Sequence, residues 1–136
     1  MLKKGEQEIV IGKLETLEKE EPKEVIKEVV KKSKSEVSMK MRANVEGVDN
    51  LAIAKLAEDC GVDYLHIDAM KKGVRDADFD LIKEISENTN IFIIGNNSIN
   101  SIPQAEKMLN SGANGISIAR AAIKGKLDFD LNEIKI

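Results

Sequence analysis

The stretch IFIIGNNSINSIPQAEKMLNSGANGISIARAAIKG, residues 91–125, contains the pattern that decides the fold. A short apolar run at 91–94 is followed by an amphipathic segment at 101–112, which has helix start and stop signals at its ends. A second apolar run follows at 115–118. The stretch therefore predicts a strand, a helix and a second strand parallel to the first.

The same unit recurs toward the N-terminus, with apolar runs separated by amphipathic segments. Each apolar run is nearly continuous, as is typical of parallel strands covered on both faces. The pattern leaves residues 8–12 open as a strand or a loop, and 13–21 reads as a charged connection. We expect strands at 37–42, 63–67, 91–94 and 115–118, and helices at 22–32, 50–60, 78–88 and 101–112, with a short helix after 120.

These elements predict an α/β fold: a partial (half) TIM (β/α)8 barrel with about four parallel βα units. A complete barrel takes roughly 250 residues, and this chain has 136. We expect one domain, 1–136, with 1–36 as an N-terminal connection and helix and 37–125 as the four units. A half-barrel exposes two sheet edges and an apolar inner face. An N-terminal half, a second copy or rearrangement into a flat sheet would cover them, and we favour a truncated or split barrel.

Composition limits the function classes. The net charge of −3 gives no general attraction to nucleic acid, although a local basic patch stays compatible with it. One cysteine excludes an internal disulfide and a multi-cysteine metal site, and we assign no metal ligand. No apolar run approaches the roughly 20 residues of a membrane span, and the N-terminus lacks a signal-peptide core, so we expect a cytoplasmic protein without membrane contact.

Polar residues follow the predicted strands at the ends where parallel α/β folds bind ligands. The last two strands end in Gly95-Asn96-Asn97 and Ala119-Arg120. Gly95 would allow close backbone approach, the asparagines offer N–H groups, and Arg120 begins a helical turn that favours phosphate. Separately, these features are more simply a turn and a surface arginine. Jointly, at consecutive strand ends, they favour a phosphate-binding site.

The ordered strand ends resemble a known family. From about Glu36 to Gly125 the chain is similar to the C-terminal half of FMN-dependent TIM-barrel oxidoreductases, most of all the dihydrouridine synthases. That family shows K-x-R, H-G-R, N-G-D-I and G-R-G-A at successive strand ends. The matching stretches here are Lys40-Met41-Arg42, His66-Ile67-Asp68, Asn96-Asn97-Ser98-Ile99 and Ala119-Arg120-Ala121-Ala122.

The resemblance implies a flavoprotein that takes part in tRNA processing. A nicotinamide cofactor would reduce FMN, and hydride would pass from the flavin to a uracil ring in tRNA. Lys40 would contact the pyrimidine edge of the flavin, and His66 would lie beside the ring or the ribityl chain. The phosphate would be held by Asn96, Asn97 and the backbone from Ile118 to Arg120. The cofactor-binding residues implied are therefore Lys40, His66, Gly95, Asn96, Asn97, Ala119 and Arg120.

The chain departs from the family pattern at several points. The family's catalytic cysteine and first strand lie in an N-terminal half that has no counterpart before Lys40, so we assign no catalytic residue, and the C-terminal tRNA-binding helical domain has no counterpart either. Asp68 stands where the family has arginine, and its role, like that of Arg42, stays open. Asn97 replaces a glycine and Ser98 a carboxylate, while Ala119 adds a methyl group near the expected phosphate.

Other interpretations remain. Lys40 and Asp68 would form a purely structural ion pair, and His66 would be a satisfied core residue; Cys60, on an apolar helix stripe, is best explained as inert core. The alternative to an oxidoreductase is a non-catalytic phosphate-ligand-binding half-barrel that forms a homodimer or pairs with a separate N-terminal half. A third function is an isomerase or aldolase in which Lys40 forms a Schiff base with a phosphorylated substrate.

Overall fold

The computed structural model describes residues 7–11, 20–125 and 130–134. These residues form one five-stranded parallel sheet with helices between successive strands. The strands are β1 (Gln7–Ile11), β2 (Val37–Arg42), β3 (Tyr64–Asp68), β4 (Phe92–Asn96) and β5 (Gly115–Ser117). The helices are α1 (Glu20–Lys32), α2 (Asn50–Asp59), α3 (Phe79–Asn88), α4 (Ile102–Asn110) and α5 (Arg120–Ile123), followed by a 3-10 turn η2 (Leu131–Glu133).

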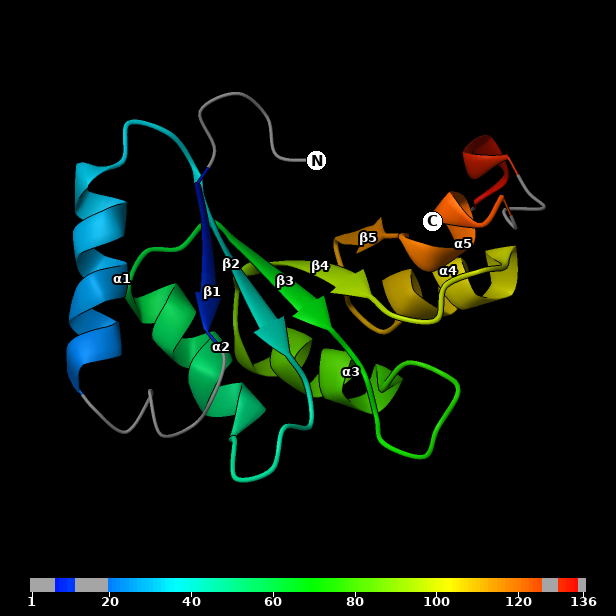
Figure 1. The fold of residues 1–136 in the computed structure, drawn as a ribbon, viewed down its shortest axis with the longest axis horizontal. Helices are drawn as coiled ribbons and strands as arrows, with labels where there is room; N and C mark the ends of the chain where they lie inside the picture. Colours follow the sequence, from blue (N-terminus) through cyan, green and yellow to red (C-terminus); the bar gives the residue numbers. More distant parts are fainter. Residues whose placement is uncertain (1–6, 12–19, 126–129, 135–136) are drawn as a thin grey trace.

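The strands lie in the sheet in their order along the chain, β1-β2-β3-β4-β5 (Figure 1). Because crossovers between parallel strands are right-handed, a consecutive order places the connecting helices on one face of the sheet. A doubly wound sheet reverses its order at a switch point, which this one does not do. The predicted partial α/β barrel is therefore confirmed. The stretch left open at 8–12 contributes β1, which pairs with β2 from Gln7↔Val37 to Ile11↔Met41.

The two faces of the sheet differ in character. Leu65 and Ile67 of β3 point toward the helices and are fully buried, with Ile82 and Ile85 of α3 in the same core. The opposite face, called here the inner face, carries mostly polar side chains from β2 and β3 and is partly open, since Phe92 is 42% exposed. Its residues on the three central strands are Ser38, Lys40, Arg42, Tyr64, His66, Asp68, Phe92, Ile94 and Asn96.

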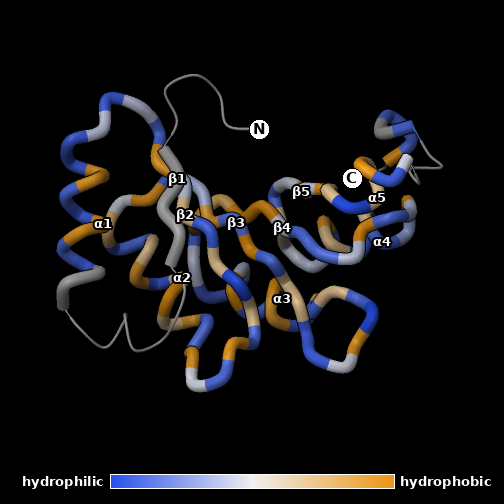
Figure 2. The backbone as a smooth tube through the Cα atoms, viewed as in Figure 1, coloured by the Kyte–Doolittle hydropathy of each residue, from blue (hydrophilic) through white to orange (hydrophobic). Residues whose placement is uncertain are grey.

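This inner face differs from the apolar face expected from the sequence. The strand sequences read as nearly continuous apolar runs, but β2 in fact alternates: Met39 and Met41 are buried, whereas Lys40 and Arg42 are exposed. The aromatic part of the face is an edge-to-face pair of Tyr64 and Phe92, with ring centroids 5.2 Å apart. Figure 2 shows hydrophobic and hydrophilic segments alternating along the strands and along the loop after β3.

Polar side chains cap the N-termini of α2, α3 and α4. Asp49 caps α2, accepting from Ala52 N–H at 3.0 Å, and Asp78 caps α3, accepting from Leu81 N–H at 3.1 Å. The sequence offers both Asp76 and Asp78 as caps for α3, and the structure uses Asp78. Ser101 caps α4, accepting from Gln104 N–H at 3.4 Å, and Gln104 Oε1 accepts in turn from Asn100 N–H at 3.0 Å. None of the helices in the described parts of the chain is long and apolar enough to cross a bilayer.

The junctions that precede β3 and β5 are built in the same way. Gly61 and Gly112 end α2 and α4 with φ of +82° and +109°, a left-handed conformation that favours glycine. Two residues later, Asp63 accepts from Val37 N–H at 2.8 Å and Asn114 accepts from Ile93 N–H at 2.8 Å. Each side chain thus fixes the first residues of the neighbouring strand. The repeat visible in the sequence is a structural repeat as well.

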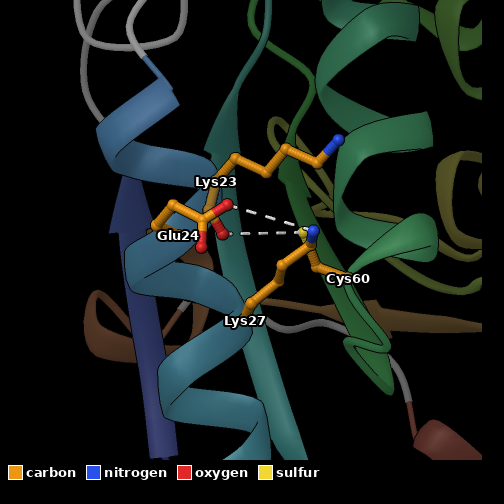
Figure 3. A network of polar contacts seen from close by, with 4 residues as sticks. All are labelled: Lys23, Glu24, Lys27 and Cys60. Atoms are coloured by element: carbon orange, nitrogen blue, oxygen red, sulfur yellow. Dashed lines mark hydrogen bonds and ion pairs between the residues drawn. The ribbon is translucent and has the colours of Figure 1, made fainter.

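Helix α1 covers the only cysteine. Cys60 is 7% exposed, and its Sγ lies 3.9 Å from the carbonyl oxygen of Lys23 (Figure 3). Burial raises the pKa of the Cys60 thiol, while the ammonium groups of Lys27 and Lys23 oppose this to a lesser degree. Cys60 therefore has the environment of an inert core residue. The apolar residues Val25, Ile26, Val29 and Val30 of this helix predict an inward face. Ile26 is buried as this predicts, whereas Val25 is 52% exposed.

Candidate functional site

A cleft of about 720 Å³ lies at the carboxyl ends of β4 and β5. It is bounded by the turn after β4, the start of α4, the end of β5 and helix α5, and Arg75 reaches it from the loop between β3 and α3. Its volume is typical of small-molecule sites, which measure roughly 300–1,000 Å³. Four residues proposed from the sequence line it together: Asn96, Asn97, Ala119 and Arg120.

The turn after β4 holds an unusual backbone conformation. Asn97 has φ of +113° and Ser98 has φ of +54°. Positive φ at two consecutive non-glycine residues costs energy, and such strain gathers at functional sites. Asn97 stands where the family that the strand ends resemble has glycine. Its φ of +113° is a conformation that glycine adopts more readily than asparagine.

Side chains hold this turn in place. Asn97 Nδ2 donates to Asp68 Oδ1 at 2.8 Å, and Ser98 Oγ donates to Asn97 Oδ1 at 2.6 Å. Asn96 Nδ2 donates to the Ser117 carbonyl at 2.6 Å, which joins the ends of β4 and β5. Asp68 and Asn97, two departures from the family pattern, are thus hydrogen-bond partners. This contact gives Asp68 a local role that the sequence left open.

Lys40 and His66 lie outside the lining of the cleft, on the inner face. In the sheet Lys40 is level with His66, and His66 is level with Ile94 of β4. The next row toward the carboxyl ends pairs Arg42 with Asp68, and Asp68 with Asn96 of the cleft. Parallel register keeps each row on one face, so Lys40 and His66 lie on the same surface as the cleft, one row further down the strands.

The structural ion pair considered from the sequence, between Lys40 and Asp68, does not form. Among the described residues, ion pairs join neighbours within α1 and within α3, and none joins Lys40 to Asp68. Arg42 instead places its Nη2 atom 3.1 Å from Met70 Sδ. Lys40 is exposed, which leaves its ammonium group available to a ligand on the inner face.

Gly95 has a packing role that the sequence did not indicate. It is buried, it is absent from the lining of the cleft, and it points toward α4. A Cβ atom at position 95 would overlap Met108 Sδ and would lie 2.8 Å from Met108 Cγ. On the side facing α4, a larger residue at position 95 would therefore have to displace the Met108 side chain. The expected backbone approach to a ligand is not needed to explain this residue.

The cleft is lined by three cationic side chains and no carboxylate. Arg120 was expected, whereas Arg75 and Lys124 were missed. Arg75 lies in a loop whose path depends on distant contacts, and Lys124 follows α5 by one position, so no local pattern marks either one. In the described part of the chain, none of the three takes part in an ion pair. The arrangement favours an anionic ligand.

The residues at the end of β5 complete the cleft. Ala119 precedes α5 with no side-chain hydrogen bond capping that helix. Ala119 and Arg120 are both exposed, so the methyl group at 119 adds bulk at the cleft without filling it. Backbone between Ile118 and Arg120 therefore faces the same space as the Asn97 turn.

Comparison with known proteins identifies relatives of the sequence. The chain is 35% identical over 127 residues to an uncharacterised protein of Methanocaldococcus jannaschii, covering 84% of this chain and 46% of that protein. It is 33% identical over 105 residues to tRNA-dihydrouridine synthase B of Vibrio parahaemolyticus, covering 73% of this chain and 33% of that enzyme. The chain thus spans a third to a half of the length of these relatives.

Solved structures share the fold at low identity. FabK from Thermotoga maritima, as its M276A mutant, superposes with a TM-score of 0.57 at 19% identity, over 82% of this chain and 33% of that one. A mandelate oxidase solved with an FMN adduct has a TM-score of 0.60 at 15% identity, over 82% of this chain and 35% of that one. At such identities the similarity extends to the fold alone.

The family assignment comes from the sequence itself. The model of the family described as "Dihydrouridine synthase (Dus)" matches residues 17–125, which include the four polar strand ends described above, those of β2, β3, β4 and β5. This match covers most of the chain and confirms the resemblance seen in the strand ends. The chain belongs to the dihydrouridine synthase family.

Proposed function

We propose that this chain provides the cofactor-phosphate half of an FMN-dependent oxidoreductase that forms dihydrouridine in tRNA. One observation carries the proposal: the Asn97 turn and the Ala119-Arg120 end of β5 line a single cleft with three cations and no carboxylate. That donor set suits the phosphate of a flavin mononucleotide. The relatives named tRNA-dihydrouridine synthase B support the choice of substrate.

In this proposal, one group of residues binds the phosphate of FMN and another contacts the flavin ring. The side-chain amides of Asn96 and Asn97 already donate hydrogen bonds to the Ser117 carbonyl and to Asp68. We therefore propose that the phosphate accepts hydrogen bonds from backbone N–H groups of the turn and from the Arg120 guanidinium. Lys40, on the same surface one row away, would place its ammonium beside the flavin ring, with His66 next to it. When bound, FMN supplies the hydride-transfer chemistry. Lys40 would stabilise negative charge on the ring.

This chain contributes no catalytic proton donor in our proposal. Its only cysteine is Cys60, buried under α1 and away from the strand ends. The acid that protonates uracil would therefore come from outside the described part of the chain. Protein that binds and reduces FMN with a nicotinamide cofactor, yet forms no dihydrouridine in transcribed tRNA by itself, is the expected result.

Flavin titration tests the proposal directly. Quenching of FMN fluorescence should saturate at one equivalent, and riboflavin, which lacks the phosphate, should bind more weakly by roughly 10- to 100-fold. Lys40→Ala should weaken both ligands, because it touches the ring and not the phosphate. Colourless protein that takes up no FMN, even at high concentration, would remove the proposal.

The second candidate is a non-catalytic phosphate-ligand-binding module that self-associates or pairs with a separate N-terminal half. It is favoured by the partly open inner face, where Phe92 is 42% exposed beside Tyr64. This candidate predicts a defined dimer by light scattering and binding of sugar phosphates without flavin reduction. A monomer that reduces bound FMN would exclude it.

A further inference from the structure

The positive charge of the cleft comes from two separate parts of the chain. Arg120 and Lys124 belong to α5 and the residue that follows it, whereas Arg75 lies in the long loop between β3 and α3. All three side chains are exposed. Two other cations of that loop, Lys71 and Lys72, are equally exposed but do not line the cleft. Among these three cations of the loop, only Arg75 lies at the cleft, so its place in the fold and not its charge distinguishes it.

The loop carrying Arg75 is tied to the wall of the cleft. Gln104 Nε2, in the first turn of α4, donates to Asp76 Oδ1 at 3.2 Å. The Gln104 Oε1 atom accepts from Asn100 N–H at 3.0 Å and from Ser101 Oγ at 3.2 Å. Gln104 itself lines the cleft. These hydrogen bonds at the N-terminus of α4 hold Gln104, which in turn fixes Asp76, the residue next to Arg75.

The other end of the loop is fixed as well. Asn44 Nδ2 donates to the Met70 carbonyl at 2.8 Å and to Asp78 Oδ2 at 3.0 Å. Asp78 N–H donates to the Ala69 carbonyl at 2.8 Å, which closes the loop at its base. A loop anchored at both ends loses less entropy when one of its side chains binds a ligand.

We infer that Arg75 is a ligand-contacting residue, which binds the anionic group of the cofactor together with Arg120, and that the Asp76–Gln104 hydrogen bond positions it. The inference rests on the proposed function and adds to it a second guanidinium on the phosphate. Two guanidinium groups from separate loops match a phosphate dianion, since each offers paired N–H donors to its oxygens.

The test compares Arg75→Gln with Lys72→Gln, which remove the same charge from the same loop. FMN affinity of Arg75→Gln should fall by roughly 10- to 100-fold, the effect of losing a hydrogen bond between charged groups. Its riboflavin affinity should stay at the wild-type value. Lys72→Gln should leave both affinities within about twofold, because exposed charges act weakly at a distance in salt. Equal losses in the two variants would overturn the inference.

Titration calorimetry with inorganic phosphate separates this inference from the proposed function. If the wild type binds FMN but Arg75→Gln binds it equally well, the role of Arg75 is wrong and the proposed function stands. If FMN does not bind, while phosphate binds the wild type and not Arg75→Gln, the cofactor is wrong and the role of Arg75 stands. Wild-type protein that binds neither ligand refutes both.

Asp76→Ala tests whether Asp76 positions Arg75. A pure charge effect and a loss of positioning predict opposite changes in FMN affinity for this variant. Removing a carboxylate near three cations would tighten phosphate binding if only net charge mattered. Loss of the bond to Gln104 instead frees the Arg75 loop, so FMN affinity should fall while riboflavin affinity is unchanged. Tighter FMN binding by Asp76→Ala would show that this hydrogen bond does not position Arg75.

Discussion

At the residue scale, the turn after β4 stores strain that a single substitution can measure. Asn97→Gly should be more stable than Asn97→Ala by about 1 kcal/mol, because glycine accepts a φ of +113° whereas alanine does not. Both variants lose the hydrogen bond to Asp68, so the difference isolates the backbone. Urea unfolding measures it. Equal stability of the two variants would mean that the turn relaxes at no cost.

Gly95 offers a second measurement at this scale. Gly95→Ala should destabilise the protein by about 1–3 kcal/mol, because its Cβ would overlap Met108 Sδ. Shortening Met108 to alanine in the same protein should recover about 1 kcal/mol or more relative to the sum of the single changes. A double-mutant cycle by chemical denaturation gives this coupling. Additive effects would contradict direct packing of Gly95 on Met108.

The residue types at the strand ends could be read from the sequence, but their partners could not. Asn96, Asn97 and Arg120 were predicted as one site because parallel strands end together, and they do line one cleft. The contact of Asp68 with Asn97 was missed, since it joins residues 29 positions apart through a turn with unfavourable φ. Strand alternation predicts that Lys40 and Arg42 share one face, and in the structure both are exposed whereas Met41 between them is buried.

At the scale of the elements, the two aspartate caps form a matched pair. Asp49 caps α2 by one hydrogen bond, whereas Asp78 caps α3 and also accepts from Asn44 Nδ2 at 3.0 Å. Asp78→Ala should therefore cost about 2 kcal/mol and Asp49→Ala about 1 kcal/mol. The melting temperatures of the two variants, measured by thermal unfolding, give the order of these losses. The opposite order would mean that the bond between Asn44 and Asp78 contributes nothing to stability.

The covering of Cys60 by α1 predicts a pH dependence. The pKa of this thiol is raised above its ordinary value of 9.0 by burial, so folding favours the protonated form. Its contribution to stability is complete below that value and is lost as pH rises through the higher folded-state pKa. Unfolding free energies measured above pH 9.0 should fall more steeply for the wild type than for Cys60→Ala. Parallel curves would contradict the shift.

Element boundaries could be predicted closely because each has a local chemical cause. The Ser101 cap and the glycines at 61 and 112 act within one helical turn, so the residues nearby are enough to locate these helix ends. The loop from 69 to 78 could not be predicted, since Gln104 and Asn44 fix it from other elements. Its arginine was therefore missed as a cleft residue.

At the scale of the whole molecule, stability should be highest in the centre of the sheet. Strand β3 is paired on both sides over five positions, whereas β5 has three residues and pairs with β4 alone. Native-state hydrogen exchange should find the slowest amides in β2, β3 and β4 and faster ones in β5. Amides of β5 as slow as those of β3 would indicate that another surface protects this edge.

The consecutive order of strands also affects how the protein can fold while it is being translated. Each strand from β2 to β5 pairs with the strand translated just before it, so none of these pairs has to wait for a distant segment to emerge from the ribosome. Topologies dominated by nearby contacts fold quickly, and chains fold from the N-terminus during translation. Each newly translated βα unit can therefore dock on a finished edge. The same geometry makes β5 a growing end, on which a further unit could add without breaking any existing pair.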